Sequence, residues 1–348
     1  MMQKEMAAAS VRRRWLRAGS LGALADGESP AIVLLRDFAI VLVLLATVAV
    51  FVVWYGPGFL SLGNLGDIAD SAALTAIFAT GEAVVVMAGA IDLSIAPIAA
   101  VSGIVGAKLL QGGMPSVPAL LLTVAFGGVL GAVNGLLVTR LKLTALVATL
   151  ATLSAYSGLA FILAGGNQIF GVDGFEWLGQ HRFWDTLTAP TVLMLIVVAV
   201  TAVFVRSTRW GMRLLAVGGN AEAARRCGLK VHAYTVAAFA FSGCMAALAG
   251  CVTLGFLTTA EPTAASTAIF DAITAVALGG VALSGGQGSI LRVLAGALVI
   301  GVITTGLLLT GVPPYYALVV TGALLVVAVA FESVLTRAAE ARANVDRG

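Results

Sequence analysis

The stretch "FAIVLVLLATVAVFVVW", residues 38–54, contains no charged side chain. A helix needs about 17–25 mostly apolar residues to cross the hydrocarbon core of a bilayer, so this run is long enough. It ends in "YGPGF" (55–59), whose glycines and proline favour a break in the helix. A cleavable signal peptide would place its apolar core directly behind the N-terminal arginines, and here the two are well separated. The stretch therefore predicts an uncleaved first membrane-spanning helix.

The composition extends this prediction to the whole chain. Of 348 residues, 60% are hydrophobic and 11% are charged, and the mean hydropathy is +1.03. Average soluble proteins are about 45–50% apolar and about 25% charged. We therefore predict an all-α polytopic membrane protein. The 41 glycines fit this class, because small residues let membrane helices approach closely, and the three cysteines have no disulfide or metal-site spacing.

Apolar runs predict about ten transmembrane helices, of which the third and the eighth are short and are expected to be broken or re-entrant. The predicted spans are 37–54, 68–89, 95–111, 117–139, 144–163, 189–206, 234–252, 269–283, 291–310 and 316–332.

The basic residues predict the orientation, since Lys and Arg collect in cytoplasmic loops. With the N-terminus inside, 18 of the 20 Lys and Arg residues lie on the cytoplasmic side, and only Lys108 and Arg182 lie outside. We therefore expect a basic cytoplasmic tail at 1–36, a membrane domain at 37–332 and a cytoplasmic tail at 333–348. Within the membrane domain, 206–233 is the long cytoplasmic loop and 164–188 the long periplasmic loop.

The cytoplasmic loop contains "GGNAEAARRCGL", residues 218–229, which predicts a short helix. Asn220 is a favourable N-cap, Glu222 and Arg225 match the helix dipole, and Gly228 is placed to end the helix. Two turns are not stable alone, so something must pack on them. The thin face given by Ala223 and Ala224 suits a groove on another protein. The alternative is a surface helix that caps the bundle.

These residues also carry a resemblance. The pattern Gly218, Gly219, Asn220, Ala223, Ala224 and Gly228 after "RSTRWG" (206–211) is similar to the coupling segment of ABC-importer permeases of the ribose/xylose/galactose branch. The stretches 88–103, 131–163 and 277–290 also resemble that family, and the likeness covers roughly residues 38–332. It implies a type II-like ABC importer permease bundle in the bacterial inner membrane.

The resemblance further implies partners. A cytoplasmic ABC ATPase, in this branch a double-cassette chain, would dock on the coupling helix formed around Glu222 to Arg225. A periplasmic binding protein would deliver a monosaccharide, and a second permease copy would complete a homodimer or heterodimer. No cofactor is expected in this chain, because none of its four lysines lies in a P-loop frame; ATP would be used by the partner.

Polar residues inside predicted spans are functional candidates, since charges are costly there. Glu82 is predicted in the middle of the second span, either facing a pathway, paired with a neighbour or facing lipid. Asp92 lies at the end of that span, Asn134 inside the fourth, and Asp271 near the outer end of the eighth. Architecture or the translocation pathway would account for these.

Other functions remain as alternatives. A permease of the same superfamily for a nucleoside or a branched-chain amino acid fits the same residues. An ion-coupled secondary transporter would need paired intramembrane charges or unwound helices. An enzyme is disfavoured, because His181 and His232 lie in loops on opposite predicted sides and no metal motif is present.

Overall fold

The computed structural model describes residues 30–183, 187–313 and 315–345, with side chains from Ala39 to Ala330 within these ranges. The longer helices are α3 (Pro30–Tyr55), α4 (Leu62–Met87), α5 (Ile95–Gln111), α6 (Ser116–Arg140), α7 (Ala145–Ala164), α9 (Ala189–Ser207), α12 (Val231–Leu257), α14 (Ile290–Leu309) and α15 (Tyr315–Val345). The shorter elements are η1 (Pro57–Leu60), α8 (Glu176–Gly179), α10 (Arg209–Gly219), α11 (Ala221–Arg226), α13 (Ala268–Leu278), β1 (Ile169–Phe170), β2 (Arg182–Phe183), β3 (Leu187–Thr188) and β4 (Thr259–Ala260).

Helix α4 is the centre of the bundle. It packs against α9, α12, α13 and α14, and 72% of its most apolar 18-residue stretch is buried inside the protein. Helix α7 lies at the periphery, and only 28% of its most apolar 18-residue stretch is buried. A peripheral helix that remains apolar on its exposed side fits a lipid environment, where outward-facing side chains have no reason to be polar.

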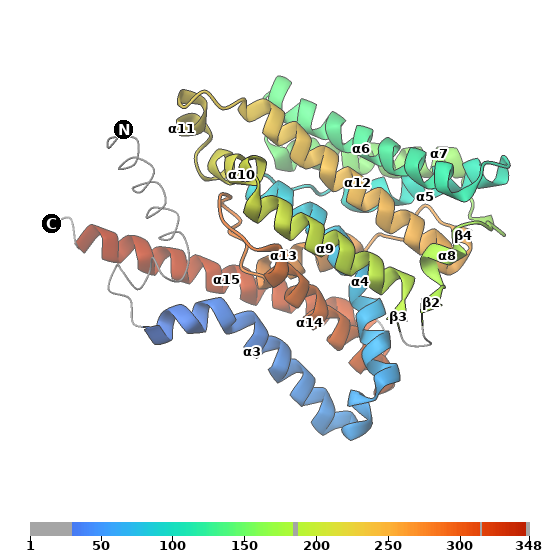
Figure 1. Cartoon of the computed structure of the whole chain (residues 1–348), viewed down its shortest axis with the longest axis horizontal. Helices are drawn as coiled ribbons and strands as arrows, with labels where there is room; N and C mark the ends of the chain where they lie inside the picture. Colours follow the sequence, from blue (N-terminus) through green and yellow to red (C-terminus); the bar gives the residue numbers. More distant parts are fainter. Residues whose placement is uncertain (1–29, 184–186, 314, 346–348) are drawn as a thin grey trace, which may run out of the picture.

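The two ends of the bundle differ in construction (Figure 1). One end carries α10 and α11, and the opposite end carries α8 and the short strands. There β1 pairs antiparallel with β4, with Ile169 opposite Ala260, so the segment after α7 is joined to the segment after α12. Strands β2 and β3 form a second small pair beside α8 and α9.

Every predicted span contains a helix in the structure. Six helices, α4, α6, α7, α9, α12 and α14, are long and apolar enough to cross a membrane. The described apolar parts of the other four, α3, α5, α13 and α15, are shorter. Helix α13 has 11 residues, a length of about 16 Å, which is about half the thickness of a hydrocarbon core, so the helix in the predicted eighth span is short.

Two helices extend into the segments predicted as tails. Helix α3 already begins at Pro30, inside the expected N-terminal tail, and 1–29 lie outside the described residues. Helix α15 continues to Val345, through most of the expected C-terminal tail. The predicted spans stopped short because charged residues interrupt the apolar runs, at Arg36 and Asp37 in α3 and at Arg337, Glu340 and Arg342 in α15, although the helices continue through them.

Glycines bring α6 and α12 into direct backbone contact. A methyl group on Gly131 would lie 2.1 Å from the carbonyl oxygen of Phe239, and one on Gly243 would lie 2.2 Å from that of Gly127. Gly127, Gly131 and Gly135 are spaced four apart, so they form one glycine stripe along α6. The same two helices carry Asn134 and Ser242, two buried polar residues of the candidate site described below.

Candidate functional site

Helix α11 begins and ends at the residues predicted from its sequence. The Oδ1 atom of Asn220 accepts a hydrogen bond from the backbone N–H of Ala223 at 2.9 Å. Gly228 follows the helix with a φ of 80°, and the N–H of Leu229 donates to the carbonyl of Ala224 at 3.0 Å. This bond to the third-last helical carbonyl, with a left-handed glycine, is a Schellman ending.

The two central alanines of α11 do not share one face, which corrects the prediction. Ala224 is buried against Val217 and Val231, whereas Ala223 is exposed. A helix turns 100° per residue, so neighbouring positions face different directions. Ala224 therefore fixes α11 to its own chain, and the outer surface consists of Ala223 and the charged residues.

Those charged residues form a local ion-pair group. Glu222 lies 3.2 Å from Arg225 and 3.1 Å from Arg226, and all three side chains are more than half exposed. Exposed pairs of this kind contribute little to stability. They place one negative and two positive side chains on an exposed surface that a partner could contact.

Three backbone segments meet at glycines just before α11. A methyl group on Gly218 would lie 1.9 Å from the carbonyl oxygen of Met87, the last residue of α4. The same carbonyl accepts a hydrogen bond from Gly286 at 3.0 Å, and a methyl on Gly285 would lie 2.7 Å from the Cα of Gly89. We call these contacts the glycine junction; they join the end of α10 to the end of α4 and to the 279–289 loop.

Asp92 is the hub of a buried polar group. Its Oδ1 atom accepts hydrogen bonds from the backbone N–H and the hydroxyl of Ser94, at 3.0 and 2.6 Å. Its Oδ2 atom accepts one from Ser242 of α12 at 3.3 Å. Asn134 of α6 donates to the Ser94 hydroxyl at 2.6 Å. Asp92 and Asn134, selected separately from the sequence, are thus brought together.

Glu82 belongs to the same group. It is fully buried, and its Oε1 atom accepts the backbone N–H of Asp92 at 3.1 Å. Its Oε2 atom has no hydrogen-bond partner among the described residues. Within this chain the side chain is buried and does not face lipid, and Glu82 lies five residues before Met87, the last residue of α4. We call Glu82, Asp92, Ser94, Asn134 and Ser242 the Asp92 cluster.

Asp271 lies apart from this cluster. It is in the first turn of α13, partly exposed, and is hydrogen-bonded to Thr321 of α15. Its contact therefore joins two helices on another side of α4. Among the described residues, no three His, Cys, Asp or Glu side chains gather as a metal site would require.

One partly buried acid, absent from the predicted candidates, also joins two helices. Asp70 of α4 accepts hydrogen bonds from the hydroxyls of Thr188 and Thr191, the latter at 2.7 Å, at the start of α9. The signal was available, because Asp70 lies in an apolar span just as Glu82 does. It attaches α9 to α4 at the end of the bundle opposite α11.

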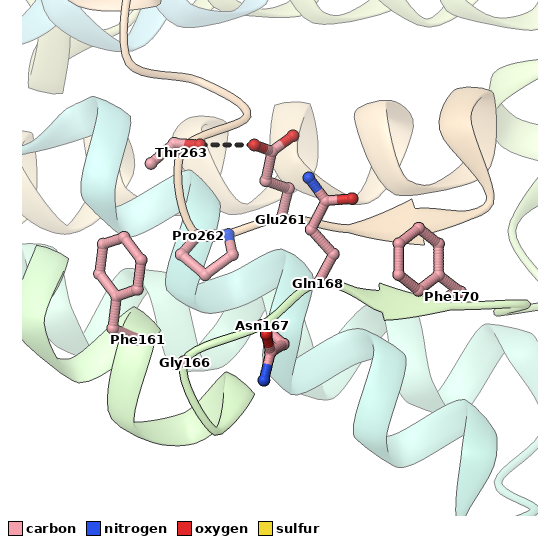
Figure 2. Close-up of a pocket in the computed structure, with 8 residues that line it drawn as sticks. All are labelled: Phe161, Gly166, Asn167, Gln168, Phe170, Glu261, Pro262 and Thr263. Atoms are coloured by element: carbon pink, nitrogen blue, oxygen red, sulfur yellow. Dashed lines mark hydrogen bonds between the residues drawn. The ribbon is translucent and has the colours of Figure 1, made fainter.

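A pocket was also missed, at the end of the bundle that carries the strands. It has a volume of about 390 Å³ and is lined by Phe161, Gly166, Asn167, Gln168, Phe170, Glu261, Pro262 and Thr263. Figure 2 shows the side chains of Glu261 and Gln168 extending in the same direction, with the Gln168 amide beside the Glu261 carboxylate, while Asn167 points the opposite way. Thr263 donates a hydrogen bond to Oε1 of Glu261 at 2.6 Å. We call this the Glu261 pocket.

Comparison with known proteins gives the family. The model described as branched-chain amino acid transport system / permease component matches residues 64–329. The ribose import permease protein of Bacillus subtilis (strain 168) is 36% identical over 78% of this chain and 85% of its own length.

Two further relatives come from Escherichia coli (strain K12). Its D-allose transport system permease protein is 33% identical over 80% of this chain and 86% of its own length. Its galactose/methyl galactoside import permease protein is 33% identical over 86% and 94%. No solved structure matches the chain significantly.

Proposed function

Because the chain belongs to the permease family described above, we propose that it is the membrane subunit of an ATP-driven ABC importer for a monosaccharide. In this role it passes the sugar from a periplasmic binding protein across the bacterial inner membrane. The observation that carries the proposal is the coverage of three sugar permeases over 85–94% of their own lengths. Likeness at that coverage extends to the α10–α11 region and to the pocket end alike.

ATP hydrolysis is assigned to a separate cytoplasmic ATPase that docks on α11. The helix is capped at both ends, fixed to the bundle by Ala224 and exposed on its remaining surface. A helix of six residues does not persist alone, so this construction supports a surface built to meet a partner. A second permease copy is the further partner in this proposal.

The orientation follows from charge. The α10–α11 end carries Arg209, Arg213, Arg225 and Arg226, and cytoplasmic loops are enriched in such residues. We therefore assign this end and both termini to the cytoplasm, with ten crossings, of which α13 and the segment before it make one. The strand end then faces the periplasm.

Uptake measurements test the transport proposal. We expect cells of the source organism to take up one of labelled D-ribose, D-allose or D-galactose, and to lose that uptake when the gene is deleted and regain it on complementation. Uptake should persist with a protonophore while ATP is maintained, and should stop on ATP depletion. Immediate collapse with the protonophore alone would favour a secondary transporter, and gene-dependent uptake of leucine instead would favour the branched-chain amino acid alternative.

Cysteine labelling tests the orientation. Cys227 follows α11 and is exposed, whereas Cys251 is buried and Cys244 is partly buried. In a Cys244→Ala, Cys251→Ala double variant, Cys227 should react with an impermeant maleimide only after the cytoplasmic side is opened. Labelling of intact spheroplasts from outside would reverse the assigned topology.

A further inference from the structure

Helix α12 and helix α13 are joined by a non-helical segment that enters the bundle. Residues 258–267, "TTAEPTAAST", start at the strand end and are held by turn-type hydrogen bonds, such as Ser266 N–H to the carbonyl of Thr263 at 3.1 Å. Ala260 and Ala265 within it are buried. Non-helical backbone at membrane depth is tolerated only where protein surrounds it or where it lines a cavity.

The depth of this segment follows from its neighbours. Ala264 and Ala265 line a narrow crevice together with Ala99 and Gly103 of α5. Gly103 lies about 12 Å along α5 from its end at Gln111, at the usual helical rise per residue. The segment therefore reaches well into the bundle and replaces one half of a membrane helix. Interrupted helices of this kind form substrate sites in other membrane transporters.

Glu261 lies where the crevice meets the larger pocket, because it lines both. The crevice has a volume of about 20 Å³, enough for about one water molecule. In the wall of the crevice α5 and α12 are in backbone contact, since a methyl group on Gly250 would lie 2.3 Å from the carbonyl oxygen of Ala99, and both residues line the crevice. The Glu261 pocket is thus a wide, open hollow at the strand end, and the crevice that continues from it toward α5 and α12 is too narrow for a sugar.

The pocket has the chemistry that a sugar requires. The Thr263 hydroxyl donates a hydrogen bond to Oε1 of Glu261. Among the described residues, no side chain or backbone N–H donates to Oε2, so this oxygen is available to a ligand. The side-chain amide of Gln168, which lies beside the Glu261 carboxylate, offers two N–H donors and one carbonyl acceptor. Phe161 and Phe170 add aromatic surface for the apolar C–H face of a sugar ring. The volume is within the roughly 300–1,000 Å³ range of small-molecule sites.

We propose that the Glu261 pocket receives the monosaccharide released by the binding protein, with Glu261 and Gln168 binding its hydroxyl groups. This inference rests on the proposed function, which assigns the strand end to the periplasm and a sugar to the importer. A surface for docking the binding protein itself is the competing use of the same residues, and the test below separates the two.

Direct sugar binding to the purified full-length permease tests the proposal without requiring transport. Saturation-transfer NMR with D-ribose, D-allose and D-galactose should detect at least one sugar on the wild-type protein. Glu261→Ala and Gln168→Ala should each weaken that binding about tenfold or more, since a hydrogen bond to a charged group is lost or left unmatched. Asp173→Ala, an exposed carboxylate of the same loop outside the pocket, is the matched control and should bind as wild type does.

Uptake and capture of the binding protein complete the test. The Glu261→Ala permease should retain the binding protein and lose about tenfold in uptake rate. Wild-type binding of all three sugars by Glu261→Ala, or no binding by the wild-type protein, would overturn the proposal. Loss of binding-protein capture with sugar binding intact would overturn it in favour of a docking surface. Sugar binding that depends on Glu261 without any sugar uptake would support the site and contradict the proposed function instead.

Discussion

Helix α11 and the Asp92 cluster are built from opposite kinds of interaction. The cap at Asn220 and the ending at Gly228 connect residues three to five positions apart, and the outer face is exposed. In the Asp92 cluster, Ser242 and Asp92 are 150 positions apart, and Asn134 and Ser94 are 40 apart. Every member of that cluster is buried.

The difference separates two tasks. The ends of α11 are specified by its own sequence, and the packing of Ala224 fixes it to the bundle, so its outer surface is free to meet a partner in the proposed function. A buried cluster with long-range partners fixes the relative positions of α4, α5, α6 and α12, and a buried polar group that loses its partner is costly. The glycine junction connects the two regions, because it joins the end of α10 to the end of α4, close to Glu82.

The largest effect is expected at the hub of the cluster. Asp92→Ala removes the acceptor for Ser94 and Ser242 and leaves buried donors without partners, so it should cost about 3 kcal/mol or more of unfolding free energy. Thermal unfolding of the purified protein in detergent measures this. Asp173→Ala removes an exposed carboxylate and should change little. Equal unfolding temperatures for the two variants would show that the Asp92 cluster does not stabilise the fold.

A smaller effect is expected at the glycine junction. Gly218→Ala forces a methyl group against Met87, and overpacking of this kind costs about 1–3 kcal/mol. Gly219→Ala is the matched neighbour, because its methyl would lie 3.7 Å from the Cα of Gly286, an ordinary contact. We expect the first variant to lose stability and coupled transport and the second to keep both. Two equally active variants would show that the junction is looser than the contacts indicate.

The cap of α11 should matter less for the whole molecule. Asn220→Ala removes the bond to the Ala223 N–H and destabilises the helix by about 1 kcal/mol. Hydrogen exchange should increase in 221–226 alone, with the bundle unchanged, and Asn220→Ser should largely restore protection. Exchange that rises throughout α12 as well would mean that α11 is part of the cooperative core.

The smallest effect is expected for an isosteric change inside the cluster. Glu82→Gln keeps an oxygen that accepts the Asp92 N–H and removes a carboxyl group beside another one, so stability should remain near the wild-type value. Glu82→Leu lacks the acceptor and should cost about 1–3 kcal/mol. A stable and active Glu82→Leu protein would contradict the contact with Asp92.

The sequence predicted what local signals encode. Apolar runs located a helix at each of the ten spans, and Asn220 and Gly228 marked both ends of α11. It could not assign the opposite faces of Ala223 and Ala224, because the burial of Ala224 depends on Val217 and Val231 folding back over it. It also missed the Glu261 pocket, since the pairing of β1 with β4 that brings Gln168 close to Glu261 joins segments about ninety positions apart.

Docking of the ATPase on α11 is the central claim, and one exposed position tests it most directly. Ala223→Trp adds bulk where the permease itself leaves space, so the variant should express, insert and unfold as wild type does. Leu141→Trp, exposed in the α6–α7 connection at the same end of the bundle, is the control. Pull-down of the ATPase with each variant, alongside sugar uptake, gives the answer. We predict that Ala223→Trp loses both the ATPase and uptake while Leu141→Trp keeps both. Full retention of the ATPase by Ala223→Trp would contradict the claim and leave α11 as a cap on the bundle surface.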